Sequence, residues 1–129
     1  MLRGSFPIKY VIMNIDVFLN KLNNNPESVT FDDTMAVISA SYEFTPASFT
    51  NGAVNNEAGQ NSGSCKLFAF ALLNQLSEEQ TLACFGAYYR DDVLKNPDGT
   101  DHQNIRNFIK HGWSGVKFDR MPLQPNKAG

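Results

Sequence analysis

Residues 67–73 read LFAFALL, an unbroken apolar run, and this stretch decides the fold of the chain. Successive residues of a helix point in different directions around its axis, so a helix with this sequence is apolar on every side. Such a helix is stable only where other elements cover it. We therefore predict a central, buried helix here, capped at its start by Ser62 or Ser64.

Two amphipathic helices are predicted before the central helix. Asn14 is suited to cap the first of them, and its apolar side chains recur at the helical intervals of three and four residues. These side chains are Ile15, Phe18, Leu19 and Leu22. Thr30 and Asp33 have the spacing of a capping-box variant and begin a second helix, which the sequence Thr45-Pro46 ends.

Two more helices are predicted after the central one. Ser77 and Gln80 form a capping box at the start of a fourth helix. The inward face of that helix is predicted to carry Leu82, Phe85 and Tyr89. A fifth helix follows the turn sequence at residues 96–99, with Asp101 as its cap and Gly112 as its natural end.

The remaining segments favour loops and short extended pieces. Asn51-Gly52 is a turn sequence, and short extended elements are predicted near residues 45–52 and 113–118. Residues 51–63 are rich in asparagine and glycine and are predicted to form a long loop, while residues 122–129 are expected to fray. The fold class is therefore mainly α (α+β possible), with about five helices in one domain and a small β element.

The composition of this 129-residue chain excludes several classes of protein. Its formal net charge of −2 does not suit a strongly basic nucleic-acid-binding protein. No run of about twenty apolar residues is present, so no membrane span is predicted. Two cysteines are too few for a disulfide-rich scaffold, and Cys65, Cys84, His102 and His111 lack zinc-ligand spacing. We expect no nucleic acid or membrane as a partner, and no metal or other cofactor.

Cys65 is the first candidate for chemistry. It lies at the predicted start of the central helix, where free backbone N–H groups and the neighbouring Lys66 favour a thiolate and lower a thiol pKa. His102 is the better of the two histidines to act as its base. Asp101 is a poor orienter for His102, because adjacent side chains on a helix do not face each other. The alternative interpretation is that Cys65 is a small buried core residue.

Two polar runs flank the turn at residues 96–99 and could form a binding site with the 51–63 loop. The runs are YYRD at residues 88–91 and DHQNIR at residues 101–106. Together they would give a pocket rich in donors and acceptors, able to hold an anion or a peptide. Its candidate ligand-binding residues are Asn61, Ser64, Arg90, Asn104 and Arg106. The alternative is a structural network that caps helices and pins the turn, with Arg90 or Arg106 paired to an aspartate.

Five stretches of the sequence resemble one known family. They are FTNG at residues 49–52, NSGSCKLFAF at 61–70, CFGAYYR at 84–90, DHQNIRNF at 101–108, and Gly112-Trp113. In this order they resemble the HopJ type III effector family, over residues 13–121. The resemblance implies a small bacterial protein named for delivery into host cells by a type III system. It brings no established activity, cofactor or catalytic residue.

Three functions are consistent with these observations. The first is a HopJ-like protein of undefined activity that binds a protein or a small ligand. The second is a cysteine-dependent hydrolase or transferase that uses Cys65 and His102. The third is a housekeeping protein that carries an inherited effector name.

The start of the chain bears on where the protein acts. Met13 precedes the first clear helix pattern, so we expect it to be the natural start, with residues 1–12 a poorly ordered upstream extension. Little polar leader then remains for export, which favours the bacterial cytoplasm, whereas the family name implies delivery into a host cell.

Overall fold

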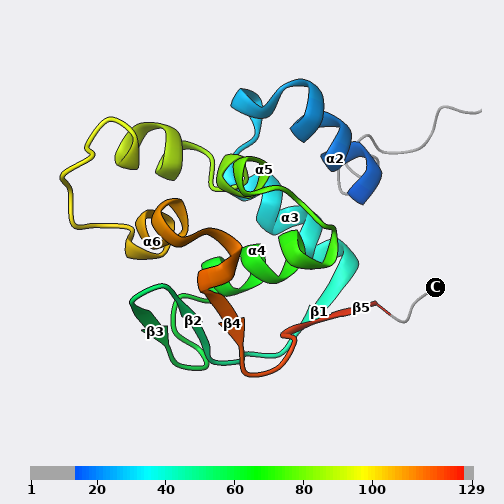
Figure 1. The fold of residues 1–129 in the computed structure, drawn as a ribbon. Coiled ribbons are helices and arrows are strands. Elements are labelled where there is room, and N and C mark those ends of the chain that lie inside the picture. Colours follow the sequence, from blue (N-terminus) through cyan, green and yellow to red (C-terminus); the bar gives the residue numbers. More distant parts are fainter. Residues whose placement is uncertain (1–13, 127–129) are drawn as a thin grey trace, which may run out of the picture.

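A computed structural model describes residues 14–126 and places the apolar stretch in the middle of the molecule (Figure 1). It forms helix α4, Ser62–Leu73. The side chains from Leu67 to Ala71 are fully buried. The last turn reaches the surface, because Leu72 and Leu73 are 47% and 42% exposed. The predicted central helix is confirmed, and its end marks the surface of the domain.

Four other α-helices surround α4, so the prediction of about five helices is confirmed for the described residues. They are α2 (Ile15–Asn24), α3 (Phe31–Ser41), α5 (Glu78–Ala83) and α6 (Gln103–His111). Three short helical segments lie along the chain between these helices or after the last of them: η1 (Pro26–Ser28), η2 (Tyr88–Val93) and η3 (Gly112–Gly115). Asn14 caps α2, and both predicted capping boxes are present, at α3 and α5.

An aromatic cluster around Phe68 holds the helices and the sheet together. The ring of Phe68 is fully buried and lies 5.0 Å from that of Phe108 on α6 and 5.5 Å from that of Phe85. The ring centroids of Phe49 and Trp113 lie 6.2 and 6.3 Å from the ring centroid of Phe68. Because these rings come from four separate segments, Phe68 joins parts of the chain that are far apart in sequence.

Two small antiparallel sheets complete the α+β fold. In one, β2 (Phe49–Asn51) lies between β3 (Val54–Asn56) and β4 (Val116–Phe118). The predicted turn at Asn51-Gly52 joins β2 to β3, so part of the expected 51–63 loop is a strand. The extended element predicted for residues 113–118 is a strand only in β4, because residues 112–115 form η3.

The second sheet corrects the prediction of a frayed tail for residues 122–126. Strand β5 (Leu123–Pro125) pairs with β1 (Tyr42–Phe44), and Asn126 donates its backbone N–H to Ser41. Leu123 is only 1% exposed, so burial of this side chain anchors a segment whose composition favours a loop. Residues 127–129 and the proposed extension 1–12 lie outside the described residues.

The predicted fourth helix is broken in two at Gly86, which was not expected. Its backbone has a φ of +64°, and a Cβ there would stand 2.7 Å from the backbone nitrogen of Phe31. Only glycine fits this conformation and this close approach without strain. The chain therefore turns after α5, and Tyr89 lies on the separate segment η2 rather than on the same helix as Leu82.

Candidate ligand pocket

A cavity of about 380 Å³ lies between the start of α4, the start of α6 and η2. Four predicted site residues meet in its wall: Asn61, Ser64, His102 and Asn104. The wall is completed by Phe31, Val54, Gly63, Phe85, Tyr88, Gln103 and Ile105. We call this cavity the α4–α6 pocket. Its lining comes from segments separated by more than seventy residues, and parts of the 51–63 loop and of the polar runs 88–91 and 101–106 meet here.

A network of asparagine side chains supports two residues of the pocket wall, Asn61 and Asn104. The Asn51 amide donates to the backbone oxygen of Asn104 at 2.7 Å and to its Oδ1 at 3.0 Å. Asn56 and Asn104 each donate to the other's Oδ1, at 3.2 and 3.0 Å. Asn61 joins by donating to Asn56 Oδ1 at 2.7 Å. The network links the β2–β3 hairpin to the first turns of α4 and α6, and so holds the pocket residues in place.

Sequence reasoning missed Asn51 and Asn56 as parts of the site. The chain contains fourteen asparagines, and most asparagines serve at caps and turns, so composition did not distinguish the two. Both are at least 98% buried in the fold. No local pattern marks them, because their burial and their hydrogen-bond partners arise only where the β2–β3 hairpin meets α6.

Both helices that meet at the pocket begin in an unusual way. Their N-cap residues, Asn61 and His102, have left-handed backbones with φ of 50° and 51°, and neither side chain caps its own helix. Within the described residues, the backbone N–H groups of Gly63, Ser64 and Asn104 have no hydrogen-bond acceptor. Two helix starts thus bring unpaired donors and partial positive charge to one cavity.

This finding corrects the predicted caps of both helices. Neither Ser62 nor Ser64 caps α4, since both lie inside the helix after Asn61. Asp101 does not cap α6, because its carboxylate instead accepts a hydrogen bond from Arg106 at 2.6 Å. The strong preference of Asp101 for a guanidinium over a backbone N–H leaves the start of α6 uncapped.

His102 is held by a carboxylate that the sequence did not reveal. Its Nε2 lies 3.0 Å from Asp92 Oδ2 on η2 and 3.8 Å from Asp101 Oδ2. Tyr88, also on η2, places its ring 5.2 Å from the imidazole. Asp92 was not found because the expected helix ran straight through residue 86, which would have directed this carboxylate elsewhere. The Asp101 side chain approaches His102 although adjacent side chains were expected not to face each other, and Asp92 is the nearer of the two carboxylates.

Cys65 lies in the core and does not line the α4–α6 pocket. Its side chain is 2% exposed, and its Sγ lies 3.7 Å from the carbonyl oxygen of Ala47. Burial raises the pKa of the Cys65 thiol above its ordinary value, and the opposing charge of Lys66 is too weak to reverse this. The predicted lowering of this pKa is therefore wrong. The sulfur faces the protein interior, where a thiolate is poorly solvated.

Alkylation will check this environment. We expect iodoacetamide to modify Cys65 of the native protein at least about tenfold more slowly than in the urea-unfolded chain, because modification must await local opening. Peptide mass spectrometry separates Cys65 from Cys84, which is fully buried and has its pKa raised to about 12 by burial. Equal rates for Cys65 in native and unfolded protein would contradict its assignment to the core.

The two arginines predicted for the site lie elsewhere. Arg90 donates to the backbone oxygens of Pro26 and Val29, at 3.3 and 2.7 Å, and lines a separate cavity beside α2 and α5. These bonds join η2 to η1. Arg90 therefore does not contribute its charge to the α4–α6 pocket.

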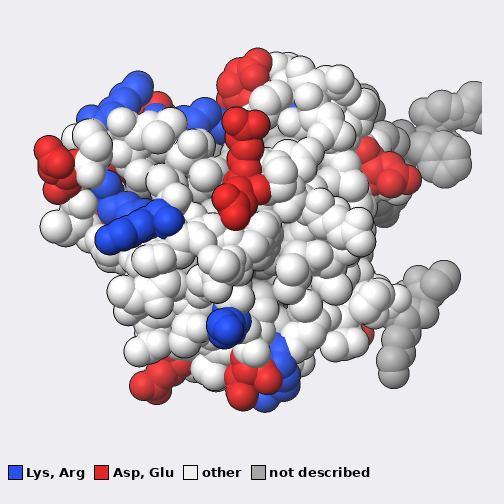
Figure 2. Space-filling model, viewed as in Figure 1, with Lys and Arg blue, Asp and Glu red and all other residues white. Residues whose placement is uncertain are grey.

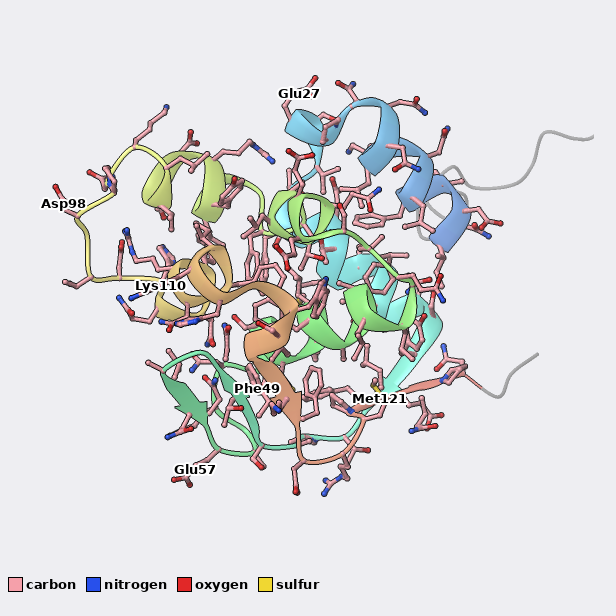
Figure 3. The ribbon with its side chains drawn as sticks, viewed as in Figure 1. Glu27, Phe49, Glu57, Asp98, Lys110 and Met121 are labelled. Atoms are coloured by element: carbon pink, nitrogen blue, oxygen red, sulfur yellow. The ribbon has the colours of Figure 1, made fainter. Side chains whose placement is uncertain are left out.

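Arg106 clamps the loop that leads into α6, whose outer tip carries Asp98 (Figure 3). It donates to the backbone oxygens of Asp101 and Asn96, at 2.6 and 2.9 Å, in addition to the Asp101 carboxylate. The hydrogen bond from Arg106 holds the pKa of Asp101 below its usual range. The guanidinium thus shapes the loop before the pocket and is absent from the pocket wall.

On the face that Figure 2 presents, acidic and basic side chains are both present and are separated by large uncharged areas. Among residues 14–126, no group of three or more histidine, cysteine or acidic side chains is placed to hold a metal ion. No helix in that range is long and apolar enough to cross a membrane.

Comparisons with known proteins agree with the sequence resemblance. The fold matches a solved structure described as "Crystal structure of unknown function protein VPA0580", with a TM-score of 0.88 and 50% sequence identity, over 97% of this chain and all of the other. No curated protein matches the chain. The family described as HopJ type III effector protein matches residues 15–123. The chain therefore belongs to the HopJ type III effector protein family.

Proposed function

We propose that this HopJ-family protein binds a small molecule carrying a carboxylate or similar anionic group in the α4–α6 pocket. The observation that carries the proposal is the meeting of two helix starts, with unpaired N–H groups, in the wall of one cavity. Such groups are suited to anions because each supplies a donor and a partial positive charge. The volume of about 380 Å³ is in the range of small-molecule sites.

The rest of the wall indicates the body of the ligand. Phe31, Val54, Phe85 and Ile105 add apolar surface to the cavity, and Tyr88 stands at its edge with 44% of its surface exposed. Aromatic rings of this kind pack well against another planar ring. A ligand with an anionic head and an apolar or aromatic body therefore complements both halves of the pocket, and benzoate is the simplest probe with these two parts.

A titration with benzoate tests the proposal. We expect saturable shifts of the backbone N–H resonances of Gly63, Ser64 and Asn104 in two-dimensional NMR spectra. Benzamide has the same ring without the charge, so it should bind more weakly by at least about threefold if the helix starts recognise the anion. Benzoate shifts confined to other parts of the chain, or equal affinities for both probes, would contradict the proposal.

A pair of variants on η2 locates the bound ring. Tyr88→Ala should weaken benzoate binding by about three- to tenfold, the range expected when an aromatic packing partner is lost. Leu94→Ala is the matched control, because Leu94 is 52% exposed at the end of the same segment and does not line the pocket. Equal affinities of the two variants would place the ring elsewhere.

The cysteine-dependent mechanism is not the one that the geometry favours. Cys65 is buried with a raised pKa, and His102 faces a cavity that Cys65 does not line. A thiolate attack would need these two side chains to share one open site. The groups left for chemistry in the pocket are His102, the Asp92 carboxylate that contacts it, and the N–H groups at the two helix starts.

A further inference from the structure

We infer that the α4–α6 pocket hydrolyses a carboxylic ester, with His102 as the general base and Asp92 as the residue that positions it. The inference rests on the proposed function, because the acyl group of the ester must enter the same pocket as the anionic ligand. It adds an activity that ligand binding alone does not require. The juxtaposition behind it is a carboxylate-held imidazole beside unpaired backbone donors in one cavity.

The contact with Asp92 selects the tautomer of His102. An ionised carboxylate only accepts hydrogen bonds, so Nε2, at 3.0 Å from Asp92 Oδ2, must donate. A neutral imidazole then carries its lone pair on Nδ1. His102 lines the pocket while Asp92 does not, so the carboxylate holds the ring from outside the cavity. This arrangement leaves Nδ1 as the atom that accepts a proton from a molecule in the pocket.

Several groups keep the imidazole in this position. The His102 side chain is only 28% exposed, and the Tyr88 ring lies against it at 5.2 Å. The charged groups that face it are Asp92 on η2 and Asp101 at 3.8 Å, and the charge of Asp101 is already matched by Arg106. Asp92 is therefore the carboxylate whose charge faces the imidazolium that forms during proton transfer.

The proposed reaction uses the imidazole of His102 and the unpaired N–H groups of residues that line the same cavity. Nδ1 takes a proton from a water molecule as the water oxygen attacks the ester carbonyl carbon, and the carbonyl electron pair moves onto its oxygen. The unpaired N–H groups at the starts of α4 and α6 stabilise this oxyanion. When the carbonyl re-forms, the bond to the alcohol oxygen breaks, and the imidazolium returns its proton to that oxygen. The products are an alcohol and a carboxylic acid, whose ionised form is the ligand class proposed above.

Hydrolysis of 4-nitrophenyl acetate tests this inference, with free imidazole at equal concentration as the reference. The wild-type protein should hydrolyse the ester about 100-fold faster than free imidazole, which is the lower end of the rate enhancement given by a positioned acid–base group. His102→Gln should lose at least about tenfold in kcat/KM, whereas His111→Gln, which changes the other histidine of the chain, should stay within about twofold because His111 does not line the pocket. Equal rates of the two variants would overturn the inference.

Two further measurements separate a catalytic from a structural role and this inference from the proposed function. Asp92→Asn should lower kcat with KM nearly unchanged, because an amide still accepts a hydrogen bond from Nε2 but places no negative charge beside the imidazolium. A raised KM with an unchanged kcat would contradict the positioning role. Benzoate binding is measured on the same proteins. If the wild-type protein binds benzoate but does not hydrolyse the ester, only the catalytic inference is overturned. If it does neither, the proposed function is overturned as well.

Discussion

Replacing Phe68 with alanine should lower the free energy of unfolding by about 4 kcal/mol, within the range found for large-to-small changes in protein cores. The ring is fully buried and contacts four other aromatic side chains from separate segments, which are Phe49, Phe85, Phe108 and Trp113. Removing it leaves a cavity that α4 cannot close, because its neighbours are held by their own elements. The loss would take a large part of the stability of a domain of this size.

Urea unfolding measures this effect through the fluorescence of Trp113, the single tryptophan of the chain, which packs against Phe68. Phe68→Leu is the matched variant, since it keeps most of the volume and should cost clearly less than alanine. A loss below about 1 kcal/mol for Phe68→Ala, the size typical of an average substitution, would show that Phe68 is not central to the core.

Replacing Asn104 with alanine should lower the free energy of unfolding by about 3 kcal/mol, because buried polar groups lose their partners. The Oδ1 of Asn104 accepts from Asn51 and Asn56, and its amide donates to Asn56 Oδ1. All three residues are at least 93% buried, so water does not readily replace the lost bonds. The hairpin would also lose a link to α6, and benzoate binding should weaken as the pocket wall loosens.

Asn55→Ala is the control for this prediction. Asn55 precedes Asn56 on β3 and is exposed, so its replacement should change stability by no more than about 0.5 kcal/mol. Both variants are compared by urea unfolding and by the NMR titration described above. If Asn104→Ala were as stable as Asn55→Ala, the buried amides would not be acting as one network.

Local pattern was sufficient for most helices of this protein. The capping pairs Thr30–Asp33 and Ser77–Gln80 predicted two helix starts correctly, since a capping box forms within four residues. It was insufficient where distant segments intervene. The predicted fourth helix breaks at Gly86, where the backbone of Phe31 approaches closely. The segment after residue 122 forms a strand because Leu123 is buried in the domain. Neither contact can be predicted from the neighbouring residues, because each involves a segment that is distant in the sequence.

Some of the predicted site residues line the pocket and others do not. Asn61, Ser64, His102 and Asn104 were predicted from polar runs flanking a helix start or a turn, and they line one pocket. Arg90 and Arg106 come from the same runs, yet they bind backbone oxygens outside it. Residue type alone does not show whether an arginine lines a pocket or binds the backbone, because a guanidinium donates hydrogen bonds to a loop carbonyl as well as to an anion.

The amino-acid sequence by itself determined the central helix and most of the helices around it, because apolar periodicity and helix capping act over a few residues. The family followed from the resemblance of five stretches of the sequence, which the family match over residues 15–123 bears out. Only the tertiary structure decided that Cys65 is a core residue, that Asp92 holds His102, and that Asn51 and Asn56 support the pocket. The physical reason is that burial and hydrogen-bond partnership depend on which distant segments meet. In this protein the meeting of α4, α6 and the β2–β3 hairpin creates the pocket.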